Sequence, residues 1–189
     1  MKTYQQFILE AKQKAYVTVG IPGSGKSTIV KHMQSKDPSI GHHELDKSRK
    51  ALGKGPAYFG PDLMQHQNSG IESDAKKGNP VVVSNTALPK AHRNASVNQL
   101  KDLGYDTKTV VLPTSPRAAR RRNRNRSEGQ VPGFVMSSMS RQRRGINTNP
   151  RGGGALSRKE LRAGRKEFKK LHKKFRFTKP AMKRSGAIT

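Results

Sequence analysis

Cysteine is absent from this 189-residue chain, and so are long runs of apolar residues. Without cysteine the chain can form neither a disulfide nor a cysteine-ligated zinc site. No apolar segment approaches the length that spans a membrane, and the N-terminus offers only "FIL" where a secretory signal needs a longer stretch. We therefore expect a soluble protein with no membrane partner, which works in a reducing compartment or inside a particle.

Acidic residues are also scarce. The chain has 12 of them against 39 lysines and arginines, which gives a formal net charge of +27. Of this surplus, 20 charges fall within residues 117–189, and the front of the chain has the character of a globular domain. An excess of this size indicates a polyanionic partner, in practice nucleic acid or another phosphate-rich surface.

Strand-like and helix-like segments alternate along the front of the chain. Runs rich in β-branched residues predict strands, two of them buried on both faces, and the segments between them predict helices. This alternation predicts a three-layer α/β sandwich in which helices cover both faces of a parallel sheet. The expected strands cover residues 15–20, 41–45, 81–86 and 107–113, and the expected helices cover 26–35, 61–78, 91–104, 115–126 and 132–143.

The last part of the chain predicts a basic helical extension, residues 157–189, after a linker at 147–156. Ser157 and Glu160 have the spacing of a capping box, which predicts a helix running to about residue 175. Lysines and arginines surround a single apolar stripe on this helix, so the helix either docks on the domain or lies against nucleic acid. The stripe consists of Leu161, Phe168, Leu171 and Phe175.

A phosphate-binding loop lies between the first expected strand and the first expected helix. The segment "GIPGSGKST", residues 20–28, fits the P-loop pattern G-x-x-x-x-G-K-[ST]. Glycines let backbone N–H groups converge on phosphate oxygens, the lysine adds positive charge, and the serine hydroxyl can ligate Mg²⁺. The loop therefore predicts binding of ATP and Mg²⁺, with Ser27 as the metal ligand. The predicted binding residues are Gly20, Gly23, Ser24, Gly25, Lys26, Ser27 and Thr28.

Asp46 and Arg49 are candidates for the acceptor side of a phosphoryl transfer. The two residues are three positions apart just after the second expected strand, so on a first helical turn they would face the same way. There the aspartate can act as a base and the arginine can hold an acceptor phosphate. Taken alone, the pair is also compatible with a solvated loop. The histidines show no metal-binding spacing, and we expect His42 and His43 to lie on the surface of an edge strand.

Several of these motifs, taken in order, resemble the kinase domain of polynucleotide 5′-kinases, above all the kinase half of the phage kinase/phosphatase. The segments that carry the resemblance are "TVGIPGSGKST", "LDKSR", "VVVSNTAL", "RRRNRNR" and "VP", and it covers roughly residues 15–145. The resemblance implies a P-loop kinase fold that transfers the γ-phosphate of ATP to 5′-hydroxyl ends of DNA or RNA. Lys26, which binds ATP, would also take part in catalysis.

The resemblance also implies roles for individual residues. Asp46 would be the general base that activates the 5′-hydroxyl, and Arg49 would contact the 3′-phosphate of the acceptor. Arg122, in an arginine-rich lid at 115–126, would stabilise the transferring phosphoryl group, and Arg126 is a weaker candidate for the lid. From composition alone, the lid arginines could equally coat DNA phosphates.

Two departures from the family pattern matter. The third strand ends in "SNT" where the family commonly has "SDT", so Asn85 can accept a hydrogen bond from Arg49 but cannot neutralise it. No acid pair of the "DxDGT" type follows, so we expect kinase activity without phosphatase activity.

The first eleven residues, "MKTYQQFILEA", resemble the capsid-targeting propeptide of internal head proteins in large tailed phages. In that family the head-maturation protease cuts after a glutamate that has Ile or Leu two positions before it. Ile8 and Glu10 meet this rule, so we expect one cut between Glu10 and Ala11. The resemblance implies a kinase domain at 11–146 that is packaged in the virion with DNA and enters the host cytoplasm with the genome. From the residues alone, an amphipathic helix docked on the domain remains the alternative.

Two other functions stay open at this stage. One is a non-catalytic DNA-binding internal head protein that retains the P-loop fold, which the arginine excess and Asn85 favour. The other is a P-loop kinase with a small-molecule acceptor, a class that also places an aspartate base after the second strand but does not need so basic a surface.

Overall fold

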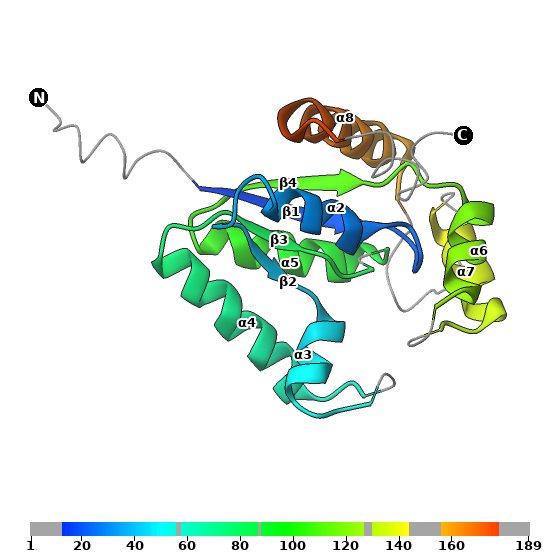
Figure 1. Cartoon of the computed structure of the whole chain (residues 1–189), viewed down its shortest axis with the longest axis horizontal. Helices are drawn as coiled ribbons and strands as arrows, with labels where there is room; N and C mark the ends of the chain where they lie inside the picture. Colours follow the sequence, from blue (N-terminus) through cyan, green and yellow to red (C-terminus); the bar gives the residue numbers. More distant parts are fainter. Residues whose placement is uncertain (1–12, 56–57, 87, 127–129, 144–155, 178–189) are drawn as a thin grey trace, which may run out of the picture.

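In the computed structural model, residues 13–55, 58–86, 88–126, 130–143 and 156–177 are described. Within them, four parallel strands form one sheet in the order β2-β3-β1-β4 (Figure 1). The predicted α/β fold with a parallel sheet is therefore confirmed. The strands are β1 (Lys14–Val19), β2 (Gly41–His43), β3 (Val81–Val83) and β4 (Asp106–Val111).

Helices cover both faces of the sheet, as the strand patterns require. Val17 of β1 points into a core with Ile71 of α4 (Pro61–Lys76) and Leu100 of α5 (Lys90–Asp102). Tyr16, directly before Val17, lies on the other face of the sheet. It packs in a second core with α2 (Lys26–Gln34) and α8 (Arg158–Phe175). The two cores account for the unbroken apolar run of β3, because its valines divide between them.

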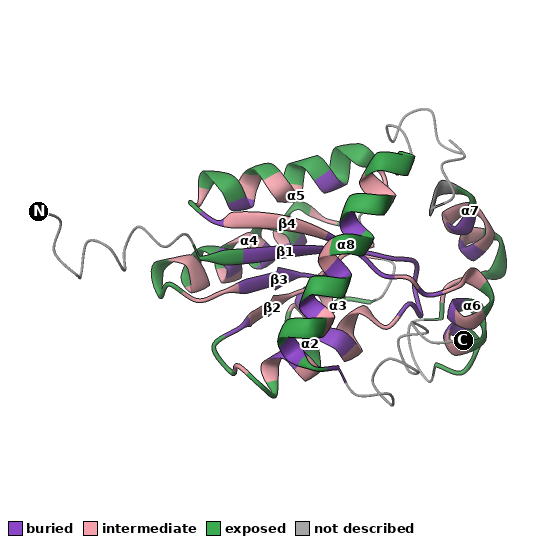
Figure 2. Cartoon of the chain, turned by 90° about the horizontal axis from the view of Figure 1, so that it is seen from above, coloured by how far each residue is buried: buried purple, intermediate pink, exposed green. Residues whose placement is uncertain are grey.

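The basic helix α8 docks on the domain, which decides between the two alternatives that the sequence left open. Its buried residues Phe168, Leu171 and Phe175 join the second core, and the helix packs against β4 and runs across the strands (Figures 1 and 2). At Gly164 the approach is so close that an added Cβ would lie 2.4 Å from a side-chain methyl of Val111. The lysines and arginines of α8 occupy its outer side.

Two contacts fix the start of α8. The predicted capping box is present, because the Ser157 hydroxyl accepts from the Glu160 backbone N–H and the Glu160 carboxylate accepts from the Ser157 N–H. The same carboxylate accepts a hydrogen bond from Arg93 of α5 at 2.6 Å, and the Arg93 side chain is only 3% exposed. The capping glutamate thus also pairs with a buried charge and ties α8 to α5.

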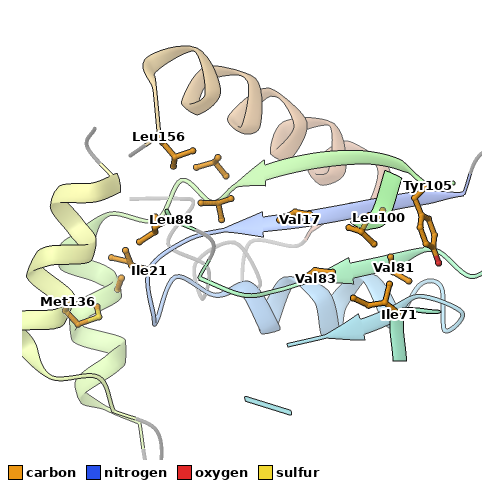
Figure 3. Packing of buried hydrophobic residues seen from close by; sticks show 14 residues of the cluster. Val17, Ile21, Ile71, Val81, Val83, Leu88, Leu100, Tyr105, Met136 and Leu156 are labelled. Atoms are coloured by element: carbon orange, nitrogen blue, oxygen red, sulfur yellow. The ribbon is translucent and has the colours of Figure 1, made fainter. Parts of the chain in front are cut away.

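Three further helices gather at the carboxyl ends of the strands. They are α3 (Leu45–Ala51), which follows β2, and α6 (Pro116–Arg124) and α7 (Gly133–Arg143), which lie side by side beyond β4 (Figure 1). Met136 of α7 reaches the first core near Ile21 and Leu88 (Figure 3), so this end of the molecule is packed onto the sheet.

Two expectations fall outside the described residues. The proposed propeptide at 1–10 with its cleavage point at Glu10 and Ala11 is one of them, and most of the linker at 147–156 is the other. Among the helices that the structure describes, none is both long and apolar enough to cross a membrane.

Candidate active site

The P-loop connects β1 to α2 and has the backbone conformation that a phosphate cradle needs. Gly23 and Gly25 adopt φ angles of 76° and 90°, which side chains other than glycine rarely tolerate. The first turn of α2 has no side-chain cap and no acidic residue. Its N–H groups and positive dipole end are therefore directed at the loop, and the arrangement fits a bound polyphosphate.

Ser24 and Thr28 complete the loop in different ways. Ser24 is 2% exposed, and its hydroxyl has no hydrogen-bond partner among the described residues. Its backbone carbonyl accepts from the hydroxyl of Thr114 at 2.7 Å, which anchors the loop to the chain after β4. A Cβ at Gly20 would lie 2.4 Å from the Ser24 hydroxyl oxygen, so a larger residue there would displace the Ser24 side chain. Thr28 is half-buried in the first turn of α2.

Lys26 lies at the centre of the charged groups of the site. Its ammonium donates to the Gly20 carbonyl oxygen at 2.9 Å. Burial and, to a smaller extent, the positive charge of Arg126 lower the pKa of Lys26 to about 8, although the carboxylates of Glu44 and Asp46 act in the opposite direction. The pKa of Lys26 thus depends on one lid arginine and on two carboxylates.

Ser27 contacts an acid that the sequence analysis did not identify. Its hydroxyl donates to a carboxylate oxygen of Glu44 at 3.0 Å, and the same oxygen lies 3.4 Å from Nε2 of His42. Burial raises the pKa of Glu44, but hydrogen bonds from His42 and Ser27 and the charges of His42 and Lys47 outweigh burial and hold it below its usual range. Glu44 is therefore an ionised carboxylate beside the predicted Mg²⁺ ligand.

The expected surface position of the two histidines is wrong. β2 is an edge strand, but the His42 side chain is only 1% exposed, and its Nε2 lies 2.7 Å from the Ser84 hydroxyl. The His43 side chain is 14% exposed and pairs with Asp74 of α4 at 2.8 Å. Both rings are turned inward because helices cover the sheet at this edge. The sequence signal that could have revealed Glu44 and His42 is their position at the carboxyl end of a strand, where ligands of parallel sheets bind.

Asp46 and Arg49 form the expected pair on α3. The Arg49 guanidinium donates to the Asp46 carboxylate at 2.6 Å and, through Nε, to the Tyr58 carbonyl oxygen at 2.8 Å. Asp46 is 78% exposed, whereas the Arg49 side chain is 15% exposed. The arginine is thus held rigidly from both sides, and the carboxylate is open to an incoming hydroxyl group.

Asn85 does not contact Arg49, contrary to expectation. Its side-chain oxygen accepts from the Leu45 N–H at 3.0 Å, and its amide exchanges hydrogen bonds with Gln67 of α4. Asn85 therefore holds the start of α3, and with it the position of Asp46. An aspartate at this position would leave the oxygen of the Gln67 amide without its donor, so asparagine suits these contacts.

The lid helix α6 packs directly on the P-loop. An added Cβ on Gly23 would lie 2.4 Å from the Ala119 carbonyl oxygen, so only glycine permits this contact. Arg122 reaches back to the Gly23 carbonyl oxygen at 3.4 Å, and burial, with the charge of Arg121, lowers the pKa of Arg122. Arg122 and Arg126 both lie at the loop, so the site brings two lid cations close to the position of a bound phosphate.

Comparisons with known proteins identify the family and the fold. Residues 16–146 match a family described as AAA domain, and no curated protein matches significantly. A structure of the Pnkp1/Rnl/Hen1 RNA repair complex contains a similar chain, with a TM-score of 0.57 and 18% identity, covering 69% of this chain and 42% of that one. This chain therefore matches less than half the length of that relative.

Two smaller proteins are similar over most of their length. A tunicamycin resistance protein from Deinococcus radiodurans has a TM-score of 0.54 and 17% identity, covering 88% of this chain and 98% of that one. A sugar kinase from Janibacter has a TM-score of 0.50 and 15% identity, covering 83% and 93%. At these identities the likenesses establish the fold alone. The match over residues 16–146 extends over most of the chain, which thus belongs to this family of AAA domains and has the fold of a P-loop kinase.

Proposed function

We propose that the chain is an ATP-dependent polynucleotide 5′-hydroxyl kinase without a phosphatase activity. The observation that carries the proposal is the placement of the Asp46–Arg49 pair. Asp46 is exposed at the start of α3, at the edge of the sheet where the P-loop lies, and its negative charge partly offsets the lowering of the Lys26 pKa. The strongly basic surface and the fold shared with a chain of an RNA repair complex support a polynucleotide as the acceptor.

In the proposed reaction the 5′-hydroxyl oxygen of the acceptor forms a bond to the γ-phosphorus of ATP. The bond between that phosphorus and the oxygen bridging to the β-phosphate breaks, ADP leaves, and the hydroxyl proton passes to the Asp46 carboxylate. Lys26 and Arg122 balance the charge on the transferring group. Arg49 lies beside the base and has donors left for a phosphate of the acceptor, because its two described partners occupy Nε and Nη1.

The residues present also fit a Mg²⁺ ion that accompanies the nucleotide. The Ser27 hydroxyl and the ionised Glu44 carboxylate are oxygen donors 3.0 Å apart, the type of ligand that Mg²⁺ prefers. We propose that both hold the ion, directly or through its water molecules. When bound, Mg²⁺ neutralises charge on the phosphates.

The test is transfer of labelled γ-phosphate from ATP to 5′-hydroxyl oligonucleotides, with Asp46→Asn as the matched variant. Asparagine keeps the shape and the hydrogen bond to Arg49 but accepts no proton, so we expect transfer to fall by about 10²–10⁴-fold. ATP binding should be unchanged. A chain that binds ATP and DNA yet transfers no phosphate would instead be the non-catalytic internal protein.

A small-molecule acceptor is the second candidate function, because a sugar kinase shares the fold over most of its length. The two acceptor classes are separated by competition. If an oligonucleotide with a 5′-hydroxyl is the acceptor, sugars and nucleosides at millimolar concentration should not slow its phosphorylation. Phosphorylation of a sugar, with no transfer to oligonucleotides, would establish the second candidate.

We further propose that this kinase is carried in a phage head and enters the host with the genome. The proposal rests on the likeness of the first eleven residues to a capsid-targeting propeptide and on the cationic surface, which would neutralise packaged DNA. The experiment is N-terminal sequencing of the protein from purified virions, where a chain starting at Ala11 is expected.

A further inference from the structure

A second concave surface lies on the far side of the lid helix from the P-loop. It is a cavity of about 1470 Å³ between α6, α7 and the first half of α8. Its described wall contains no residue of the P-loop, of α3 or of the loop after β3, so it is separate from the candidate active site. Nothing in the phosphoryl transfer described above uses it.

Arginine side chains from two different elements line this cavity. Arg117, Arg120 and Arg124 of α6 recur at intervals of three and four positions, which places them on one face of the helix. Arg122 belongs to a different face, since it reaches Gly23 in the active site. Arg165, from the second turn of α8, adds a fourth guanidinium across the cavity.

No residue of the described wall neutralises these positive charges. That wall contains no aspartate or glutamate, and the one described hydrogen bond that the four guanidinium groups donate is from Arg120 to the neutral Ser137 hydroxyl at 3.3 Å. A concave surface with charges of one sign concentrates the field and attracts polyanions. Guanidinium groups with free donors are suited to phosphate oxygens in particular.

The size of the cavity and the other residues of its wall indicate which kind of polyanion it binds. The cavity is larger than the roughly 300–1,000 Å³ that accommodate a small ligand. Between the arginines the wall contains polar side chains and also the side chains of Pro132, Val131 and Leu161, which offer apolar contact to bases. Phe134, next to the wall residue Gly133, is 78% exposed, as is common for aromatic residues on which bases stack.

We infer that this cavity binds the phosphate backbone of single-stranded nucleic acid, with Arg117, Arg120, Arg124 and Arg165 as its phosphate contacts. The inference rests on the proposed function only for the identity of the strand, which would be the acceptor beyond its 5′ end. Because the binding can be measured without phosphate transfer, each proposal can fail while the other holds.

The experiment measures the affinity of the full chain for a 5′-phosphorylated oligothymidylate as a function of salt concentration. This strand cannot accept a phosphate at its 5′ end. Each phosphate contact on a single strand contributes about −0.7 to the slope of log K against log salt. Replacing the four cavity arginines by glutamine should therefore make the slope shallower by as much as about 3. The Arg→Lys version of the same variant should retain most of the slope.

The matched control replaces four exposed lysines outside the cavity wall, which removes the same charge. Those lysines are Lys159, Lys166, Lys169 and Lys173 of α8. The inference is overturned if the control and the glutamine variant lose the same slope, or if the parent chain does not bind the strand. It is also overturned if saturating ATP displaces the strand, because the strand would then occupy the P-loop. Thermal unfolding of both variants shows whether they are folded.

Discussion

The unusual pKa of Lys26 makes a prediction about how nucleotide affinity depends on pH. In the nucleotide-free protein this pKa is about 8, because the ammonium group is buried and lies near Arg126. The lysine is then about 90% protonated at pH 7 and about 10% protonated at pH 9. A bound triphosphate stabilises the charged form. Affinity for a non-hydrolysable ATP analogue should therefore fall by about tenfold over this interval, since binding must take up a proton.

Lys26→Arg is the control for this effect. A guanidinium remains charged at both pH values, so the affinity of the variant should be flat over the same interval even if it is weaker throughout. Isothermal titration calorimetry in buffers of different ionisation enthalpy measures both the affinity and the proton uptake. A parent affinity that does not change between pH 7 and pH 9, or an equal loss in the arginine variant, would refute the assignment of this pKa to Lys26.

The lowered pKa of Lys26 has the opposite effect on the stability of the nucleotide-free protein, which should increase with pH. A lysine whose folded-state pKa lies below its unfolded value binds fewer protons when folded, between pH 8 and about pH 10. Its contribution to stability therefore increases with pH over this window. Stability without nucleotide should rise while nucleotide affinity falls, and differential scanning calorimetry with and without the analogue can observe both trends.

The other predictions concern single positions. Gly164→Ala places a methyl group against the buried Val111, so we expect a loss of about 1–3 kcal/mol in unfolding free energy despite the better helix propensity of alanine, measured by urea denaturation. Ala163→Gly is its exposed counterpart and should cost only about 1 kcal/mol. Glu44→Gln keeps a partner for Ser27 but removes the charge, so nucleotide binding should need several-fold more Mg²⁺, a shift that calorimetry detects and that an unchanged Mg²⁺ requirement would exclude. Arg122→Ala should retain oligonucleotide binding and lose transfer by about 10³–10⁵-fold. A substantial residual rate would remove Arg122 from the mechanism.

Much of the fold follows from local sequence patterns, and the site follows in part. The run of valines in β3 and the loop before α2 predict their structures directly, because each requires only neighbouring residues. The Asp46–Arg49 contact follows from their spacing on one helical turn. In contrast, Glu44 and Asn85 have partners on other elements. Glu44 accepts from Ser27 of α2, and Asn85 accepts from Gln67 of α4. No local pattern encodes such contacts, so the roles of these two residues appear only when the chain is folded.

The docking of α8 shows a related limit. Its apolar stripe predicted that one side of the helix is covered, but amphipathicity does not tell what covers it. The decisive features are Gly164, which permits close approach to β4, and Arg93, a buried arginine of α5 that needs the Glu160 carboxylate. Removing α8 would therefore expose the sheet and take the Glu160 carboxylate away from Arg93, so such a truncation tests stability before it tests nucleic-acid binding.

The lid helix α6 shows why the number of arginines alone could not reveal their roles. From composition alone, the lid arginines could coat DNA phosphates, and only the family resemblance assigned Arg122 to catalysis. On the helix they separate by face, because the contact of Ala119 with Gly23 fixes its rotation. That contact brings Arg122 to the P-loop and leaves Arg117, Arg120 and Arg124 for the cavity on the other side. A single glycine contact thus assigns the arginines of one helix to two surfaces.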